Sequence, residues 1–90
     1  MKLFQFQFSR DAEKMFSTLP SLVQKRIFNK FAFFERTDAP LSFAKKLQGF
    51  NDLYRFRVGD YRIIVKPKAQ EIMIILLVLK IGHRKDIYES

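Results

Sequence analysis

The feature that most constrains the fold is a pair of alternating segments joined by a turn dipeptide. Residues 53–58 alternate between apolar and polar side chains, as a half-buried strand does, and Tyr61, Ile63 and Val65 continue the apolar face in residues 61–66. The dipeptide Gly59-Asp60 between them is typical of a two-residue hairpin turn. The sequence therefore predicts an antiparallel β-hairpin centred on this turn.

Three arginines share one face of the predicted hairpin. A two-residue turn places Arg57 directly opposite Arg62, and strand alternation places Arg55 on the same face. Cross-strand neighbours lie about 5 Å apart, where like charges repel by roughly 1 kcal/mol in water. Because folding alone gives no reason for this arrangement, we favour an anion-binding face over the alternative of a merely solvated one.

The charge around the hairpin supports this interpretation. The segment 45–68 carries seven basic residues against two acidic ones: Lys45, Lys46, Arg55, Arg57, Arg62, Lys66 and Lys68 against Asp52 and Asp60. The whole chain has 17 Lys and Arg against 9 Asp and Glu, a formal charge of +8. Such an excess favours a polyanionic or acidic partner, and arginine suits bidentate recognition of phosphate.

The N-terminal part of the chain predicts one strand and two helices. Residues 2–8 alternate with period two, with Phe4, Phe6 and Phe8 on one face and glutamines on the other, which predicts a half-buried strand. Ser9 is suited to cap a helix that runs to about Thr18, and Pro20 begins a second helix that ends near Arg36. Its apolar positions follow helical spacing: Val23, Ile27, Phe31 and Phe34.

The remaining segments complete a sheet. Residues 37–51 predict a connecting loop with room for one helical turn, and Pro67 is expected to end the second hairpin strand. The apolar run 72–79 predicts a central strand. The whole is one α+β domain over residues 1–90: an N-terminal strand, a two-helix hairpin and an antiparallel three-stranded meander in one sheet.

Several classes of function are disfavoured. The chain has no cysteine, its longest apolar run is far shorter than the ~20 residues of a membrane helix, and its N-terminus is unlike a signal peptide. We therefore expect a cytoplasmic protein that does not contact membranes. The carboxylates form no metal-binding motif and there is no glycine-rich phosphate loop, so neither a metal nor a cofactor is expected.

The C-terminal segment adds candidates for catalysis. RNA can be cleaved without a metal, because its 2′-hydroxyl is an internal nucleophile and the protein need only position the phosphate, stabilise charge and move protons. His83 is the only histidine, next to Arg84 and five positions before Tyr88. We expect these three residues to converge on the face of the three arginines.

Three parts of the sequence together resemble the RelE/ParE superfamily of type II toxins. They are Leu47-Gln48-Gly49, the hairpin from Leu53 to Ile64, and the motif from Ile81 to Tyr88. The resemblance covers nearly the whole chain and implies the RelE-like fold, which is related to microbial ribonucleases. It also implies a toxin that is neutralised by a cognate, acidic RelB-like antitoxin in a hetero-oligomeric complex.

RelE-type members cut mRNA in the ribosomal A site without a metal, which implies a ribosome-dependent endoribonuclease that inhibits translation. The resemblance assigns catalysis to Arg62, Arg84 and Tyr88. It assigns phosphate binding to Arg55 and Arg57. In this interpretation Arg84 stabilises the leaving 5′-oxygen, and Tyr88 orients or stacks the substrate.

The chain departs from the best-known RelE-type enzymes at one point, since they carry lysines where it has Arg55 and Arg57. A guanidinium holds its proton and is a poor base. Proton abstraction would therefore fall to His83 or Lys46, or catalysis would rest mainly on positioning. Lys45 and Lys46 are expected to add to phosphate binding.

Two alternatives from other classes stay open. ParE-type members of the superfamily poison DNA gyrase and perform no chemistry themselves. A non-catalytic RNA-binding module would also need only a basic face.

Overall fold

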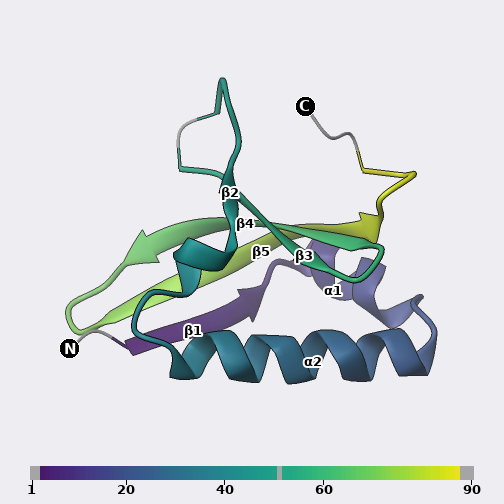
Figure 1. Cartoon of the computed structure of the whole chain (residues 1–90), viewed down its shortest axis with the longest axis horizontal. Coiled ribbons are helices and arrows are strands. Elements are labelled where there is room, and N and C mark those ends of the chain that lie inside the picture. Colours follow the sequence, from purple (N-terminus) through teal and green to yellow (C-terminus); the bar gives the residue numbers. More distant parts are fainter. Residues whose placement is uncertain (1–2, 51, 88–90) are drawn as a thin grey trace.

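The chain forms one sheet with two helices against it. The structure is a computed structural model and describes residues 3–50 and 52–87. In chain order its elements are β1 (Leu3–Phe8), α1 (Arg10–Ser17), α2 (Ser21–Arg36), the 3-10 helix η1 (Pro40–Phe43), β2 (Lys45–Lys46), β3 (Tyr54–Val58), β4 (Tyr61–Ala69) and β5 (Met73–His83). The strand order is β1-β5-β4-β3-β2 (Figure 1). The predicted α+β class is confirmed.

Most predicted elements have the expected bounds. β1 and both helices end within two residues of the predicted positions, and the loop after α2 contains the helical turn η1. Ser9 caps α1 as expected: its hydroxyl oxygen accepts the backbone N–H of Ala12 at 3.1 Å. The short strand β2, which pairs with β3, was not predicted.

The core is rich in phenylalanine and lies between the helices and one face of the sheet. Phe6 of β1 stacks on Phe31 of α2, with ring centroids 3.9 Å apart. Phe34 of α2 contacts Phe56 of β3 at 4.7 Å. Ile27 on the same side of α2 is fully buried. The helical spacing of the apolar residues in α2 therefore gives the face that covers the sheet.

The outer edge of β1 is held by a side chain from α2. The half-buried carboxylate of Glu35 accepts the backbone N–H of Phe6 at 2.8 Å. β1 pairs with β5 in parallel through its other edge. At the two ends of this pairing, the backbone N–H of Leu3 donates to Ile72, just before β5, and that of Ser9 donates to Val78 of β5. Glu35 thus satisfies an edge donor that β5 cannot reach.

Two predictions about the strands are wrong. β4 does not end at Pro67 but continues to Ala69, because pairing with β3 stops at Val65 and Pro67 pairs only with β5. A proline is tolerated where just one ladder remains. β5 does not end at residue 79 but continues to His83. It is an interior strand between β1 and β4, and β4 is the middle strand of the five.

β5 contains a bulge that reverses the side-chain alternation. Ile64 pairs with Lys80, but the next residue, Val65, pairs with Val78, so Leu79 has no partner in β4. Before the bulge Val78 faces the core, and after it Ile81 does. One extra residue therefore moves every side chain at the end of β5 to the opposite face.

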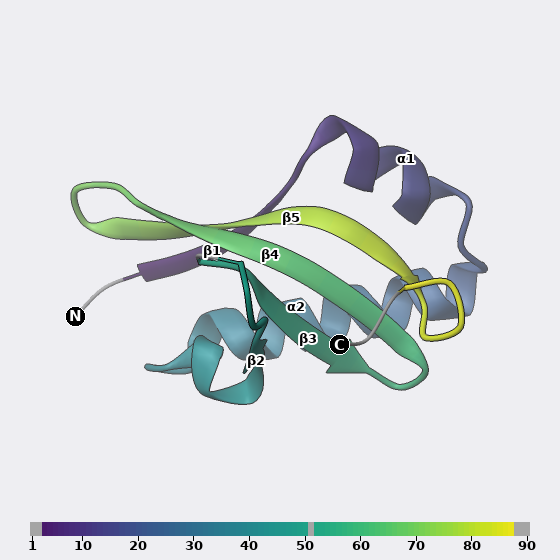
Figure 2. The same cartoon turned by 90° about the horizontal axis from the view of Figure 1, so that it is seen from above.

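The other face of the sheet, which we call the open face, lies away from α2. Figure 2 shows the strands from this side, with α2 behind β3 and β4. After β5 the chain folds back over the open face: a Cβ placed on Gly82 would lie 3.1 Å from the side chain of Ile87, which is buried. No helix in the described part of the chain is long and apolar enough to cross a membrane.

Candidate functional site

The β3–β4 hairpin has the predicted register. Arg57 pairs with Arg62 across the Gly59-Asp60 turn, and Gly59 has the positive φ of 59° that this turn requires. Arg55 lies on the same face as Arg57, because it is two residues away in the same strand. The three arginines therefore lie on the open face, as the sequence predicts.

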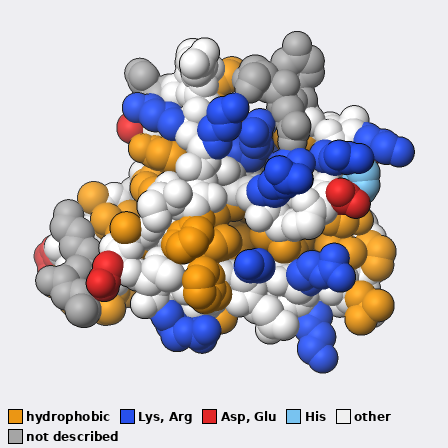
Figure 3. Space-filling model, viewed as in Figure 1, with side chains coloured by type: hydrophobic (Ala, Val, Ile, Leu, Met, Phe, Trp, Pro, Cys, Tyr) orange, Lys and Arg blue, Asp and Glu red, His pale blue; other side chains and the backbone are white. Residues whose placement is uncertain are grey.

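Two lysines extend this arrangement across the sheet. Lys45 of β2 pairs with Arg55, Arg55 pairs with Ile64, and Ile64 pairs with Lys80 of β5. Residues that pair directly have their side chains on the same face. We call this set of cations the basic face: Lys45, Arg55, Arg57, Arg62 and Lys80. Figure 3 shows Lys and Arg side chains gathered over the upper half of the molecule.

Arg62 is the most buried member of the basic face, at 4% exposed. Its Nη1 donates hydrogen bonds to the carbonyl oxygens of Gly59 at 3.0 Å and Tyr61 at 3.2 Å. These bonds hold the guanidinium against its own hairpin turn. The side chain of Arg62 is therefore fixed in position and also contributes to the turn.

Arg55 has an unmet hydrogen-bonding requirement. This side chain is half-buried, and within the described part of the chain its Nη1 is buried without a hydrogen-bond partner. A buried donor that lacks an acceptor costs about 1–3 kcal/mol. An anion bound at the basic face would supply the acceptor. Arg57, in contrast, is exposed and open to a ligand.

Arg84 lies at the same hairpin turn. Its backbone N–H donates to the carbonyl oxygen of Asp60 at 2.7 Å, and its Nε is 3.8 Å from the Asp60 carboxylate. The turn thus holds Arg62 through Gly59 and Arg84 through Asp60. The structure therefore places Arg84 beside the turn that joins β3 and β4.

His83 does not join the basic face, and the expectation that it does is wrong. It pairs with Tyr61, and the two rings contact each other edge to face with centroids 5.5 Å apart. Arg62 instead pairs with Gly82, so His83 and Arg62 lie on opposite faces of the sheet. The bulge at Leu79 is the cause, because without it the alternation of β5 would direct His83 to the open face.

His83 instead borders a hollow of about 440 Å³ near the α1–α2 connection. Its Nδ1 accepts the backbone N–H of Lys85 at 3.2 Å. Thr18 and Leu19 line the hollow from the side of the helices. The surroundings of His83 are therefore those of a turn-stabilising residue.

The two lysines predicted to bind phosphate lie on opposite faces of the sheet. Lys45 shares the face of Arg55, but Lys46 pairs with Tyr54, which packs against the core side of the sheet. Only Lys45 is therefore placed to bind phosphate at the basic face. Tyr88 lies outside the described residues.

Sequence reasoning missed two members of the site. Lys80 interrupts the apolar run that precedes it, and this was the available signal. Gly82 pairs directly with Arg62, and its lack of a side chain lets Ile87 pack against this part of the sheet. Neither follows from the hairpin alone, because both depend on the register between β4 and β5.

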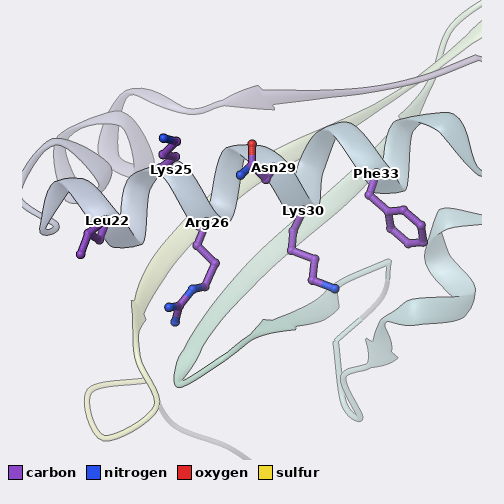
Figure 4. Close-up of a pocket in the computed structure, with 6 residues that line it drawn as sticks. All are labelled: Leu22, Lys25, Arg26, Asn29, Lys30 and Phe33. Atoms are coloured by element: carbon purple, nitrogen blue, oxygen red, sulfur yellow. The ribbon is translucent and has the colours of Figure 1, made fainter.

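A second basic surface lies on the exposed side of α2. A hollow of about 510 Å³ lies along this helix. Figure 4 shows the residues that line it, with apolar side chains at its ends and cations between them. Its lining residues are Leu22, Lys25, Arg26, Asn29, Lys30 and Phe33. Leu22 and Phe33 are 77% and 41% exposed, so this surface combines exposed apolar side chains with cations.

The described residues contain no cluster of three or more His, Asp or Glu side chains that could hold a metal ion. The groups that converge at the site are guanidinium and ammonium groups. This arrangement can bind and neutralise phosphate oxygens.

Comparison with known proteins identifies the family. A family model described as the ParE toxin of type II toxin-antitoxin system, parDE, matches residues 4–88. The chain belongs to this family of toxins. It is thus a type II toxin of the RelE/ParE superfamily, as the sequence motifs indicated.

A curated relative of this toxin is Toxin RelE3 of Methanocaldococcus jannaschii, which is 38% identical over 45 residues. The match covers 50% of this chain and 47% of that protein, so it spans about half the length of the relative.

Solved structures of toxin–antitoxin complexes share the fold of the toxin. The archaeal RelE–RelB complex of Pyrococcus horikoshii matches with a TM-score of 0.67 and 27% identity, over 94% of this chain and 99% of that one. The RelBE2 complex of Mycobacterium tuberculosis matches with a TM-score of 0.74 and 19% identity, over 91% and 99%. The second likeness shows the fold alone.

Proposed function

We propose that this toxin is a ribosome-dependent mRNA endoribonuclease that needs no metal and inhibits translation. The observation that carries the proposal is the set of three arginines on the open face. Arg57 and Arg62 are paired against their mutual repulsion, and Arg55 beside them has a buried donor that lacks an acceptor among the described residues. A phosphate at this position would offset the repulsion and accept the free hydrogen bond.

In this mechanism the 2′-oxygen of the RNA attacks the adjacent phosphorus. A bond forms between the two atoms, the bond to the 5′-oxygen breaks, and the products are a 2′,3′-cyclic phosphate and a 5′-hydroxyl. Arg55, Arg57 and Arg62 neutralise the charge that develops on the phosphate oxygens. Arg84, at the edge of the site, stabilises the leaving 5′-oxygen, and Tyr88 keeps its proposed role of orienting the substrate.

The proton of the 2′-hydroxyl needs an acceptor on the same face as the phosphate. His83 and Lys46 do not face the site, whereas Lys45 and Lys80 do. As ammonium groups these two lysines can donate a proton to the leaving 5′-oxygen but cannot accept one, so in this proposal the 2′-hydroxyl proton passes to water, and positioning and electrostatic stabilisation are the larger contributions.

The proposal includes an acidic antitoxin that neutralises the toxin. Neighbours in fold are RelB–RelE complexes, and the hollow on α2 carries three cations and exposed apolar side chains. Such a surface is complementary to an acidic, amphipathic segment of a partner. Because ribosomes are the proposed target, we place the toxin in the cytoplasm.

Cleavage on programmed ribosomes tests the proposal. We expect the wild type to cut mRNA in the A site in the presence of a chelator, and Arg57→Gln to cut at least about tenfold more slowly, the loss of one charged hydrogen bond. Lys68→Gln is the matched control, since Lys68 is an exposed strand cation that pairs with Ile75. Equal rates for the wild type and Arg57→Gln would refute the phosphate-binding role.

The ParE name of the matching family keeps gyrase inhibition as a second candidate. Induced expression separates the two: cut transcripts with loss of protein synthesis support the ribonuclease, whereas DNA breaks with intact transcripts support the gyrase inhibitor. Absence of toxicity would favour a non-catalytic RNA-binding module.

A further inference from the structure

An apolar hollow lies beside the basic face. Its volume is about 420 Å³, within the range of small-molecule sites. The residues that line it include Leu47, Phe50 and Leu53 from the loop between β2 and β3, Ile64 and Lys80 from the sheet, and Ile87 from the turn after β5. It therefore collects apolar side chains on the face that otherwise carries cations.

The sheet register fixes the hollow between charged groups. Ile64 pairs with Arg55 on one side and with Lys80 on the other, so this apolar residue has a cation on each side. Arg62 is two residues from Ile64 in the same strand, roughly 7 Å away along the strand. A ligand bound in the hollow can thus contact Arg55 and Arg62 through a neighbouring group of the same molecule.

Phe50 is the exposed aromatic side chain of this hollow. It is 57% exposed, and it lies in a loop that Leu47 and Leu53 close with a backbone hydrogen bond of 3.0 Å. The loop turns sharply at Gly49, whose φ is 79°, and Figure 1 shows it projecting from the sheet on the side away from α2. This fold leaves an aromatic ring in solvent beside an apolar surface.

Exposed aromatic rings combined with cations are the usual components of sites for single-stranded nucleic acid. Bases stack on the ring, and arginine or lysine holds the phosphates. The Nη1 of Arg55, beside Ile64, is buried and has no hydrogen-bond partner within residues 3–50 and 52–87, which gives a direct reason to expect an acceptor here.

We propose that the hollow binds one unstacked base of a single-stranded RNA. In this arrangement the base stacks on Phe50 over Ile64, and Arg55 and Lys80 hold the phosphates on either side of it. The inference rests on the proposed function, since it assumes that RNA is the ligand of the basic face. It adds a base-binding subsite to that function and makes Phe50 a binding residue.

The test uses the full-length toxin and a short 2′-O-methyl RNA that contains 2-aminopurine, which resists cleavage and loses fluorescence when its base stacks. We expect binding of the wild type to quench the fluorescence. Phe50→Ala should weaken binding by about 5- to 150-fold, the range for one stacked base, and should abolish quenching. Phe50→Tyr keeps the ring and should bind and quench like the wild type.

Phe28→Ala is the matched control, because Phe28 is 55% exposed on α2, away from the open face. Unfolding curves of each variant exclude loss of folding as the cause. The proposal is overturned if the wild type does not quench, or if Phe50→Ala binds as tightly as Phe28→Ala. It is also overturned if Phe50→Ala binds RNA normally but retains less co-expressed antitoxin, since the hollow would then be a protein-docking site.

Arg57→Gln, measured in parallel, separates this inference from the proposed function. If Arg57→Gln weakens RNA binding and Phe50→Ala does not, the phosphate site stands and the base-binding subsite is wrong. If Phe50→Ala abolishes quenching but the wild type does not cut mRNA on ribosomes, the subsite stands and the ribonuclease function is wrong.

Discussion

Arg57 and Arg62 lie directly opposite each other across the β3–β4 hairpin, with Arg57 exposed and Arg62 buried against the turn. The pair combines two different roles at one register position. Arg62 bonds to the carbonyl oxygens of its own turn, so it supports the hairpin as well as the charge of the site. Within the described part of the chain Arg57 makes no such hydrogen bond, and its repulsion with Arg62 is an electrostatic cost.

Replacing Arg57 by glutamine should therefore stabilise the toxin while it impairs binding. Removal of the like-charge pair is expected to raise the free energy of unfolding by about 0.2–1 kcal/mol. This corresponds to a rise in the midpoint of thermal unfolding of up to about 8 °C for a chain of this size. Thermal unfolding at low and high salt measures it, and the gain should shrink as salt screens the charges.

Lys68→Gln serves as the control for that measurement, because Lys68 pairs with Ile75 rather than with a cation. It should change the unfolding midpoint little. A lower midpoint for Arg57→Gln than for the wild type would show that the two arginines do not repel each other in the folded protein.

Replacing Arg62 by alanine should have the opposite effect on stability. The variant loses charged hydrogen bonds to two carbonyl oxygens and leaves a gap in a buried position, which predicts a loss of about 2–4 kcal/mol. Urea unfolding measures this loss. A change below about 0.5 kcal/mol would mean that Arg62 does not support the turn.

His83→Gln should leave cleavage on programmed ribosomes within about threefold of the wild-type rate. His83 pairs with Tyr61 and lies on the face opposite Arg62. A general base contributes about 10²- to 10⁴-fold to a rate, so the two possibilities are well separated. A loss of a hundredfold in a variant with normal unfolding behaviour would contradict the placement of His83 outside the site.

Replacing Glu35 by alanine should destabilise the edge of the sheet. The half-buried N–H of Phe6 would lose its acceptor, which predicts a loss of about 1–3 kcal/mol. Glu35→Gln keeps an acceptor oxygen and should lose less. Hydrogen exchange at the Phe6 amide provides the local measurement, and unchanged protection in Glu35→Ala would show that this bond is not formed in solution.

The local features of the sequence predicted the hairpin and its arginines correctly. A two-residue turn fixes which residues pair across it, so Arg57 opposite Arg62 follows from the position of Gly59 alone. The aromatic face of α2 also follows from residue spacing. In both cases the groups that determine the result are within a few residues of each other.

The prediction for His83 failed for a reason that is not local. Its face depends on the bulge at Leu79, and that bulge exists only in the pairing of β5 with β4. Likewise, Pro67 stays inside β4 because β3 ends opposite Val65. Neither the bulge nor the end of the ladder leaves a clear signal in the residues concerned.

The sequence by itself determined the α+β class, the family motifs and the face shared by three arginines, because turn chemistry and period-two alternation act over short distances. The tertiary structure decided which further residues share that face. In the folded chain Lys80 lies on that face, Arg62 is buried, and His83 lies on the opposite face. The reason is that a one-residue shift between two strands reverses the face of every side chain beyond it. The composition of the site therefore depends on how β5 pairs with β4.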